Sequence, residues 1–335
     1  MRRKLGFIVC VLLPMIVIAG LGYLIATHVS QRTAAVGRNV YTAPPKSSST
    51  HTKLSVKRAY LGLYEPDAPK SFADNEQFAT KIGVRPAISL YYSSWWEPFQ
   101  SHFADTARAH GSVPFVQMIP AGQGVSIKQL IAGQYDNYIR TFASEIAHYN
   151  HPVIVSFAPE ANGSWYKWGN GKLPASQWIA AWRHVVSTFR SQGANNVTWL
   201  WTINRWSNNG RIGTPSKWWP GANYVDWVGI DGYYFQRNET FHVVFGRTLS
   251  MIRKFTGKPA IISETSVGPI AGQAAKIPVL LHSIRNTGLI GLVWFDKAQH
   301  DGLYHQDWRI EDSAQATNAF KRNAWMFTTI GKKKA

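Results

Sequence analysis

The sequence has little cysteine and few acidic residues, and both shortages limit its chemistry. Cys10 is the single cysteine, which excludes an intrachain disulfide and a cysteine-based zinc site. Asp and Glu number 18 against 36 Lys and Arg, so few carboxylates are available for a catalytic role. None of the 11 histidines falls in a metal-binding spacing such as His-Glu-x-x-His. We therefore expect neither a metal ion nor another cofactor.

The shortage of acids also explains the net charge of +18. Such a charge can indicate nucleic acid, an anionic membrane or an anionic cell wall. The only basic runs are Arg2-Arg3-Lys4 and Lys332-Lys333-Lys334, and no nucleic-acid-binding motif is present. We expect no nucleic-acid partner, while contact with an anionic cell wall remains an alternative.

An apolar N-terminal segment predicts a membrane association. Residues 1–26 combine a basic start with an uncharged stretch long enough to span a bilayer, which favours a signal anchor. The alternative is a signal peptide cleaved near Thr33-Ala34-Ala35. Because the positive cluster stays inside, both predict an extracytoplasmic chain, either membrane-anchored or secreted. Residues 27–57 are polar and read as a flexible linker, and 329–335 as a basic tail.

The remaining segment, 58–328, alternates between short apolar runs and helical patterns. Trp178, Ala181, Trp182, Val185 and Phe189 form one such helical stripe. Eight strands alternating with helices predict a single (β/α)8 TIM barrel. A doubly wound sheet is the alternative, but no glycine-rich phosphate loop follows the first strand. The expected strands are Ala59–Tyr64, Pro86–Tyr92, Val113–Ile119, Val153–Ala158, Val197–Thr202, Tyr224–Ile230, Pro259–Ser263 and Leu289–Phe295.

Two glutamates stand where expected strands end. Glu160 follows the run 153–158, and Glu264 follows the run 259–263. The carboxyl ends of parallel barrel strands share one rim, where active sites are built, so we expect the two side chains to converge. A pair of carboxylates is the minimum equipment for cleaving a glycosidic bond. The 15 tryptophans agree with this reading, since flat indole faces stack well on sugar rings.

Other polar and aromatic residues gather at the same expected rim. We predict that seven of them bind substrate and that Asp231 tethers backbone. Glu65, Glu97 and Glu145 are expected to be solvated or helix-face acids. The seven predicted contacts are Trp165, Trp168, Asn204, Trp206, Tyr233, Trp294 and Asp296.

Three motifs carry a resemblance to a known family. They are Pro-Glu-Ala-Asn-Gly-Ser-Trp-Tyr-Lys-Trp-Gly at 159–169, the segment 219–233, and Ile-Ser-Glu-Thr at 262–265. Over roughly 59–327 the chain resembles glycoside hydrolase family 26, which contains β-mannanases, some β-1,3-xylanases and mixed-linkage β-glucanases. The resemblance implies a (β/α)8 barrel and retaining hydrolysis of a β-linked polysaccharide.

The resemblance also assigns roles to individual residues. It implies that Glu160 is the general acid/base and Glu264 the nucleophile. Trp165 matches the aromatic residue that floors the site, and Tyr233 the tyrosine that hydrogen-bonds the nucleophile. One position departs from the pattern: well-studied mannanases of the family carry a histidine where this chain has Pro159. Proline offers no hydrogen-bond donor, so mannan is in doubt and another β-linked glycan gains weight.

Three functions follow as alternatives. The first is a monomeric endo-β-glycanase that hydrolyses a mannan-type polysaccharide, a β-1,3/1,4-glucan or a xylan by double displacement. The second is a non-catalytic protein that binds polysaccharide or cell wall on the same barrel, which Pro159 and the net charge motivate. The third is an enzyme that remodels the envelope glycan of its own cell, which the expected tether motivates.

Overall fold

A computed structural model describes residues 59–122, 124–268, 270–298 and 307–328. The predicted membrane segment 1–26, the linker 27–57 and the tail 329–335 lie outside the described residues. Within the described ranges, no helix is both long and apolar enough to cross a bilayer.

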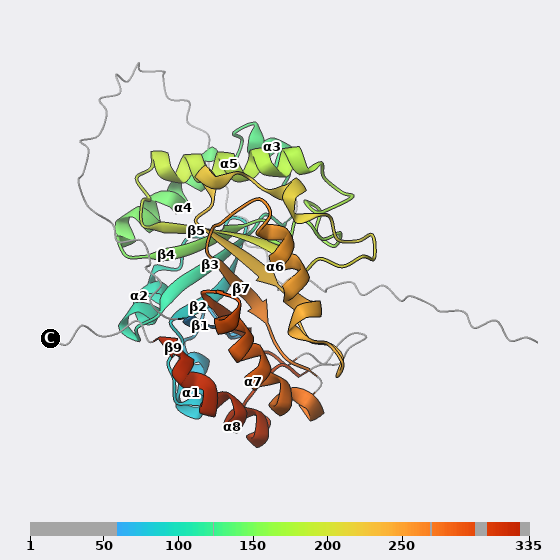
Figure 1. Ribbon diagram of the computed structural model, residues 1–335. Helices are drawn as coiled ribbons and strands as arrows, with labels where there is room; N and C mark the ends of the chain where they lie inside the picture. The colour runs from blue at the N-terminus through green and yellow to red at the C-terminus, as the bar shows by residue number, and fades with distance from the viewer. Residues whose placement is uncertain (1–58, 123, 269, 299–306, 329–335) are drawn as a thin grey trace, which may run out of the picture. The chain divides into compact units, whose positions relative to one another are not determined.

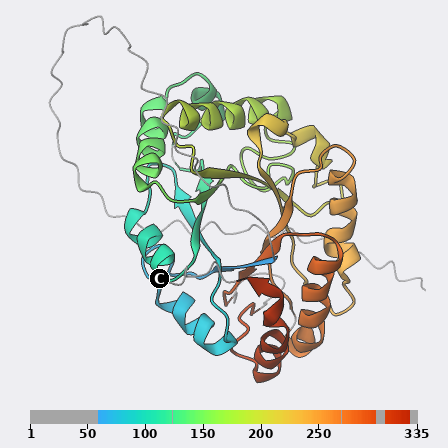
Figure 2. The same ribbon diagram turned by 60° about the vertical axis from the view of Figure 1, so that its left-hand side comes forward.

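Eight parallel strands form a closed barrel (Figure 2). Each strand pairs with the next along the chain, and β1 pairs with both β2 and β8, which closes the sheet. This closure confirms the predicted (β/α)8 barrel and excludes a doubly wound sheet. A short ninth strand, β9 (Phe327–Thr328), pairs with the start of β1. The barrel strands are β1 (Ala59–Tyr64), β2 (Ile88–Ser94), β3 (Val113–Ile119), β4 (Val153–Phe157), β5 (Val197–Asn204), β6 (Trp227–Asp231), β7 (Ala260–Thr265) and β8 (Gly291–Phe295).

The strands lie close to their predicted positions because they are buried on both faces. Every residue of β4, β6 and β7 is buried, as expected for parallel strands covered by helices. The largest difference is at β6, which begins at Trp227 because Ala222–Tyr224 forms a short 3-10 helix instead.

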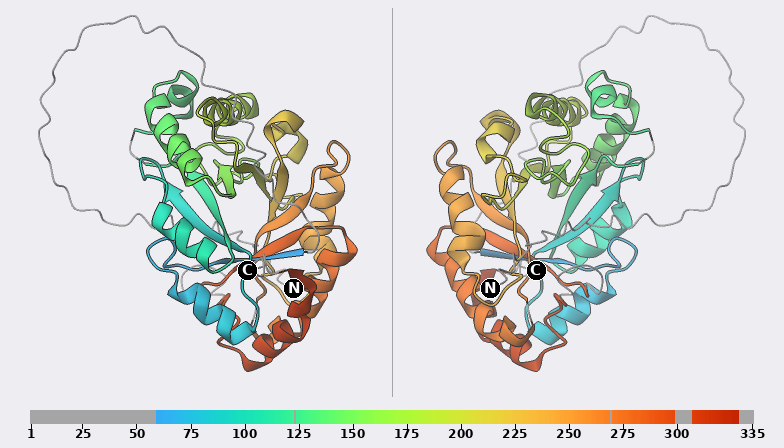
Figure 3. Two further views of the ribbon diagram at one scale, coloured as in Figure 1. Left: turned by 90° about the vertical axis from the view of Figure 1, so that its left-hand side faces the viewer. Right: turned by 90° about the vertical axis from the view of Figure 1, so that its right-hand side faces the viewer.

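Helices surround the barrel, and α7 and α8 lie side by side (Figures 1 and 2). The predicted stripe from Trp178 to Phe189 is the buried face of α5. The same ring of helices around the strands is visible from the two sides in Figure 3. The helices are α1 (Ala73–Ile82), α2 (Ser101–Ala109), α3 (Ile127–Ile131), α4 (Asp136–Tyr149), α5 (Ala175–Ser191), α6 (Arg247–Ile252), α7 (Ile270–Asn286) and α8 (Ala314–Asn323), with a π-helical turn at His242–Gly246 and 3-10 turns at Pro215–Trp218 and Ala324–Met326.

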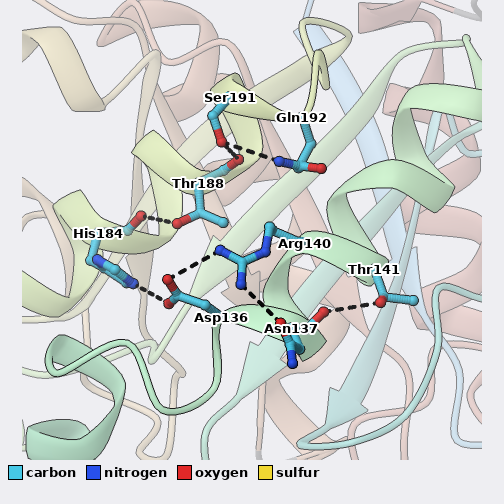
Figure 4. A network of polar contacts seen from close by, with 8 residues as sticks. All are labelled: Asp136, Asn137, Arg140, Thr141, His184, Thr188, Ser191 and Gln192. Atoms are coloured by element: carbon cyan, nitrogen blue, oxygen red, sulfur yellow. Dashed lines mark hydrogen bonds and ion pairs between the residues drawn. The ribbon is translucent and has the colours of Figure 1, made fainter. Parts of the chain in front are cut away.

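A polar network joins α4 to α5 on the outer surface of the barrel (Figure 4). His184 Nε2 of α5 lies 2.6 Å from Asp136 Oδ1 at the start of α4, and Arg140 contacts the other oxygen of Asp136 at 3.3 Å. On its opposite side, α5 is tied to the end of β4, because Trp178 Nε1 donates to the carbonyl of Ala158 at 3.0 Å. The helix pair therefore braces the segment that carries Glu160.

Candidate active site

Glu160 lies just beyond β4 on backbone that neighbouring strands hold in place. The amide of Ala158 donates to Met118 of β3 and the amide of Glu160 to Thr202 of β5, both at 3.0 Å. Between these anchors the chain turns sharply, with φ of 44° at Ala158 and 54° at Glu160. Left-handed backbone is costly for residues other than glycine and is concentrated at functional sites. The turn leaves the Glu160 side chain 5% exposed at the rim.

Two side chains hold the carboxyl group of Glu160. Trp165 Nε1 donates to Oε2 at 2.8 Å, and Asn204 Nδ2 donates to Oε1 at 2.5 Å. Asn204, the last residue of β5, is fixed in turn by a reciprocal pair of 2.8 Å bonds with Asn162. Gly163 makes room for the indole, because a Cβ there would lie 2.3 Å from the Trp165 ring. The motif around Glu160 thus forms a scaffold for one carboxyl group.

Glu264 lies in β7 and accepts three hydrogen bonds. Tyr92 OH and Gln117 Nε2 donate to Oε1 at 2.5 and 2.6 Å, while Tyr233 OH donates to Oε2 at 2.8 Å. The register of β7 shifts against both neighbouring strands at this point, and Glu264 is opposite Asp231 of β6. Such irregularities re-aim side chains next to active sites.

The two glutamates have different electrostatic surroundings. Burial and then the negative charge of Glu264 raise the pKa of Glu160 to about 8, against the hydrogen bonds from Asn204 and Trp165. Burial also raises the pKa of Glu264, but its three hydrogen bonds oppose that shift by stabilising the anion. Glu160 therefore holds its proton near neutral pH, and Glu264 is the group equipped to be ionised. A difference of this kind between the pKa values of two carboxyl groups is typical of a general acid beside a nucleophile.

A third carboxyl group, Asp231, lies behind this pair. It is fully buried, and Ser263 Oγ donates to its Oδ1 at 2.6 Å. Burial raises its pKa well above the usual range, and the charges of Glu264 and Glu160 add to the shift. A protonated Asp231 adds no negative charge beside Glu264, so its surroundings fit a structural role.

Three of the predicted substrate contacts are enclosed by the fold. Trp168 is 2% exposed, donates from Nε1 to the carbonyl of Pro159 and stacks on Tyr166. Trp294 is fully buried and donates to Asp296, itself 1% exposed. All three lie inside the rim in this structure, and their contact with substrate stays a prediction. Trp206 and Asn204 are partly exposed, and their contact with substrate stays a prediction.

The sequence reading missed Tyr92 and Gln117. Gln117 is the only side chain of β3 with hydrogen-bonding capacity, which was the available signal. Tyr92 is the last residue of an expected apolar strand, and its position offered no signal of a role in the site. The prediction that Glu65 is solvated is wrong, because this residue is 6% exposed and burial, followed by the charge of Glu311, raises its pKa to about 9. Within the described part of the chain, no group of three metal-ligating side chains is assembled.

Comparison with known proteins decides the family. The model for glycosyl hydrolase family 26 matches residues 79–328. The chain belongs to this family. Endoglucanase H of Acetivibrio thermocellus is 32% identical over 68% of this chain, and a β-1,3-xylanase of Alcaligenes sp is 28% identical over 69%. These alignments span only 25% and 43% of the two relatives.

Solved structures of the family share the fold. The catalytic domain of the endo-β-1,4-mannanase from Bacillus sp. JAMB-750 superposes with a TM-score of 0.63 at 17% identity, covering 82% of this chain and 88% of that one. At this identity the superposition supports the barrel, and the site rests on the residues described above.

Proposed function

We propose that this family 26 chain is a retaining endo-β-glycanase with Glu160 as general acid/base and Glu264 as nucleophile. The observation that carries the proposal is the contrast between the two buried carboxyl groups. One keeps its proton near neutral pH, and the other is held by three hydrogen bonds that favour its anion. A protein that only binds polysaccharide has no need for this arrangement.

The reaction proceeds in two displacements. Glu264 attacks the anomeric carbon while Glu160 gives its proton to the departing glycosidic oxygen, so the C–O bond breaks and a glycosyl ester forms on Glu264. Glu160, now ionised, takes a proton from water. The water oxygen then attacks the anomeric carbon, breaks the ester and restores both groups. Tyr92, Gln117 and Tyr233 orient the nucleophile, and Trp165 and Asn204 orient the acid.

For the substrate, we place β-glucan and β-1,3-xylan ahead of mannan. The endoglucanase and the β-1,3-xylanase each align with about two thirds of this chain. Pro159 supplies no side-chain donor beside the acid, and its carbonyl is engaged by Trp168. A site without the histidine that well-studied mannanases carry at this position fits a sugar other than the one that those mannanases bind.

A reducing-end assay on the full chain tests the proposal. The panel is lichenan, laminarin, β-1,3-xylan, cellulose, mannan, galactomannan and glucomannan, with Glu160→Ala and Glu264→Ala alongside. We expect hydrolysis of one polymer, lost in both variants and kept in Asp105→Asn, which changes an exposed carboxylate of α2. Retained hydrolysis in Glu264→Ala would refute the assignment of the nucleophile.

Anion rescue separates the two roles. With an aryl glycoside whose leaving group departs without protonation, azide should restore the activity of Glu160→Ala. The azide attacks the glycosyl ester on Glu264 and should give a β-glycosyl azide. The same anion should give an α-glycosyl azide with Glu264→Ala, because it then replaces the nucleophile directly. Proton NMR of the product distinguishes the two outcomes, and the reverse pattern would exchange the roles.

We also propose that the enzyme acts outside the cytoplasm, held to the membrane by residues 1–26. The support is the basic start and apolar stretch of the sequence. Expression with and without residues 1–26, followed by membrane fractionation and protease treatment of intact cells, tests the anchor. Recovery of the full chain in the cytoplasm would contradict it.

A further inference from the structure

Trp96 is an exposed tryptophan on the rim that carries the catalytic pair. Its side chain is 56% exposed, and it follows β2 by two residues. The same strand carries Tyr92, which donates to Glu264. At roughly 3.3 Å per residue, the four positions from Tyr92 to Trp96 span up to about 13 Å. Trp96 is therefore on the substrate side of the barrel, four residues along the chain from the tyrosine that contacts Glu264.

The turn that presents Trp96 is tightly braced. Glu97 Oε2 accepts from the amide of Ser94 at 2.8 Å, and the amide of Glu97 donates back to the carbonyl of Ser94 at 3.2 Å. From α4, Tyr138 OH donates to the carbonyl of Glu97 at 2.9 Å. The residues on both sides of Trp96 are thus fixed to the barrel and to a helix.

Aromatic neighbours support one part of the indole of Trp96. Tyr135 meets it edge-on with ring centroids 5.3 Å apart and an interplanar angle of 89°, and Tyr138 lies at 5.2 Å. The backbone of Trp96 has φ of 79°, which is a strained value for a bulky residue. The structure thus maintains an unfavourable backbone while leaving more than half of a large apolar side chain in water. Strain of this kind is concentrated at ligand-binding positions.

We infer that Trp96 is a platform for a pyranose ring of the bound polysaccharide, outside the subsite where the bond is cleaved. The inference rests on the proposed function and identifies a further binding position of the same site. An exposed indole face suits the C–H face of a β-linked pyranose, and pre-ordering by the braced turn lowers the entropy cost of binding. Chains long enough to reach Trp96 should gain affinity from it, whereas shorter chains should not.

The chain contains a matched control in Trp325. This tryptophan is 62% exposed and stands next to β9, which pairs with the start of β1 at the opposite end of the barrel. Replacing either tryptophan removes an exposed indole, but only Trp96 is on the catalytic rim.

The test measures kinetics of Trp96→Ala and Trp325→Ala on the polymer that the wild type hydrolyses and on an aryl glycoside that fills only the reacting subsite. For Trp96→Ala we expect KM on the polymer to rise by about tenfold with kcat unchanged, because the lost contact binds substrate and transition state equally. The aryl glycoside should show no change, and Trp325→Ala should match the wild type. Unchanged KM for Trp96→Ala on a polymer that the wild type cleaves would overturn the inference while leaving the proposed function intact.

Two further measurements separate binding from folding and from catalysis. Glycine adopts φ of 79° without strain, so Trp96→Gly should unfold at a higher temperature than Trp96→Ala yet show the same rise in KM. Affinity electrophoresis in polymer-containing gels reports binding without turnover. If the wild type cleaves no polymer but is retarded by one, loss of retardation in Trp96→Ala supports the platform and equal retardation refutes it. Absence of both cleavage and retardation would overturn the proposed function and the platform together.

Discussion

Removing the Tyr92 hydroxyl tests whether hydrogen bonds hold Glu264 in its anionic form. Tyr92 OH donates to Glu264 Oε1 at 2.5 Å, and this bond lowers the pKa of Glu264 against the effect of burial. A hydrogen bond to a charged group contributes about 1.5–3 kcal/mol, and one pKa unit corresponds to about 1.36 kcal/mol. Because Gln117 and Tyr233 still donate, we take the lower end of that range. The acid limb of the pH–rate profile should therefore move upward by about one pH unit in Tyr92→Phe.

The assay is kcat/KM against pH on the cleaved polymer. The two limbs of this profile report the groups proposed as nucleophile and acid in the free enzyme. Tyr91→Phe is the matched control. Tyr91 is the adjacent residue of the same strand, but its hydroxyl accepts from the amide of Gln100 instead. We expect the Tyr91→Phe profile to match the wild type. An acid limb that stays in place or moves downward in Tyr92→Phe would refute the argument that this bond stabilises the charged form of Glu264.

Three further changes act on other parts of the site and the fold. Asn204→Ala removes a donor that lowers the pKa of Glu160, so the alkaline limb, expected near pH 8, should move upward in the same assay; a downward shift would contradict the assignment. Gly163→Ala puts a methyl group 2.3 Å from the Trp165 ring, and displacing that donor should lower kcat by about tenfold or more, while circular dichroism confirms a folded barrel; normal kcat would show that the indole position is unimportant. Glu65 has a raised pKa of about 9 in the folded protein, so its stabilising effect is complete below its unfolded pKa and is lost as pH rises toward 9. The free energy of unfolding in urea should therefore fall less for Glu65→Gln than for the wild type as pH rises from about 5 to about 9. If the two proteins lost stability equally with pH, the raised pKa of Glu65 would be contradicted.

The barrel and its two glutamates were accessible from the sequence because they depend on local patterns. Strands buried on both faces read as continuous apolar runs, so β1 and β3 were predicted with their observed bounds. Glu160 and Glu264 follow such runs, and parallel strands bring their carboxyl ends to one rim. These steps need no knowledge of which side chains touch.

The orientation of individual side chains was not accessible in the same way. Trp165 and Trp168 lie in the same segment after β4, yet Trp165 donates to Glu160 whereas Trp168 is buried and donates to the carbonyl of Pro159. Trp294 of β8 is also buried and donates to Asp296. A continuous apolar run does not show which residues point into the barrel, so Tyr92 could not be distinguished from Tyr91. Glu65 follows β1 as a surface acid would, but the carboxylate that affects it comes from Glu311 near the end of the chain. Burial and charge of this kind depend on segments that only the folded barrel brings together.

The hydrogen bonds of the site also connect catalysis to closure of the barrel. Donors to Glu264 come from β2, from β3 and from the segment after β6, while Glu160 depends on the end of β5. A change that loosens one strand therefore alters the pKa of a glutamate on another strand. Because a buried carboxylate loses more by losing a donor than an exposed one, the pH–rate profile should respond to such changes before the unfolding temperature does. The two limbs of the profile then indicate which half of the barrel has moved, since the acid limb depends on β2, β3 and β6 and the alkaline limb on β4 and β5.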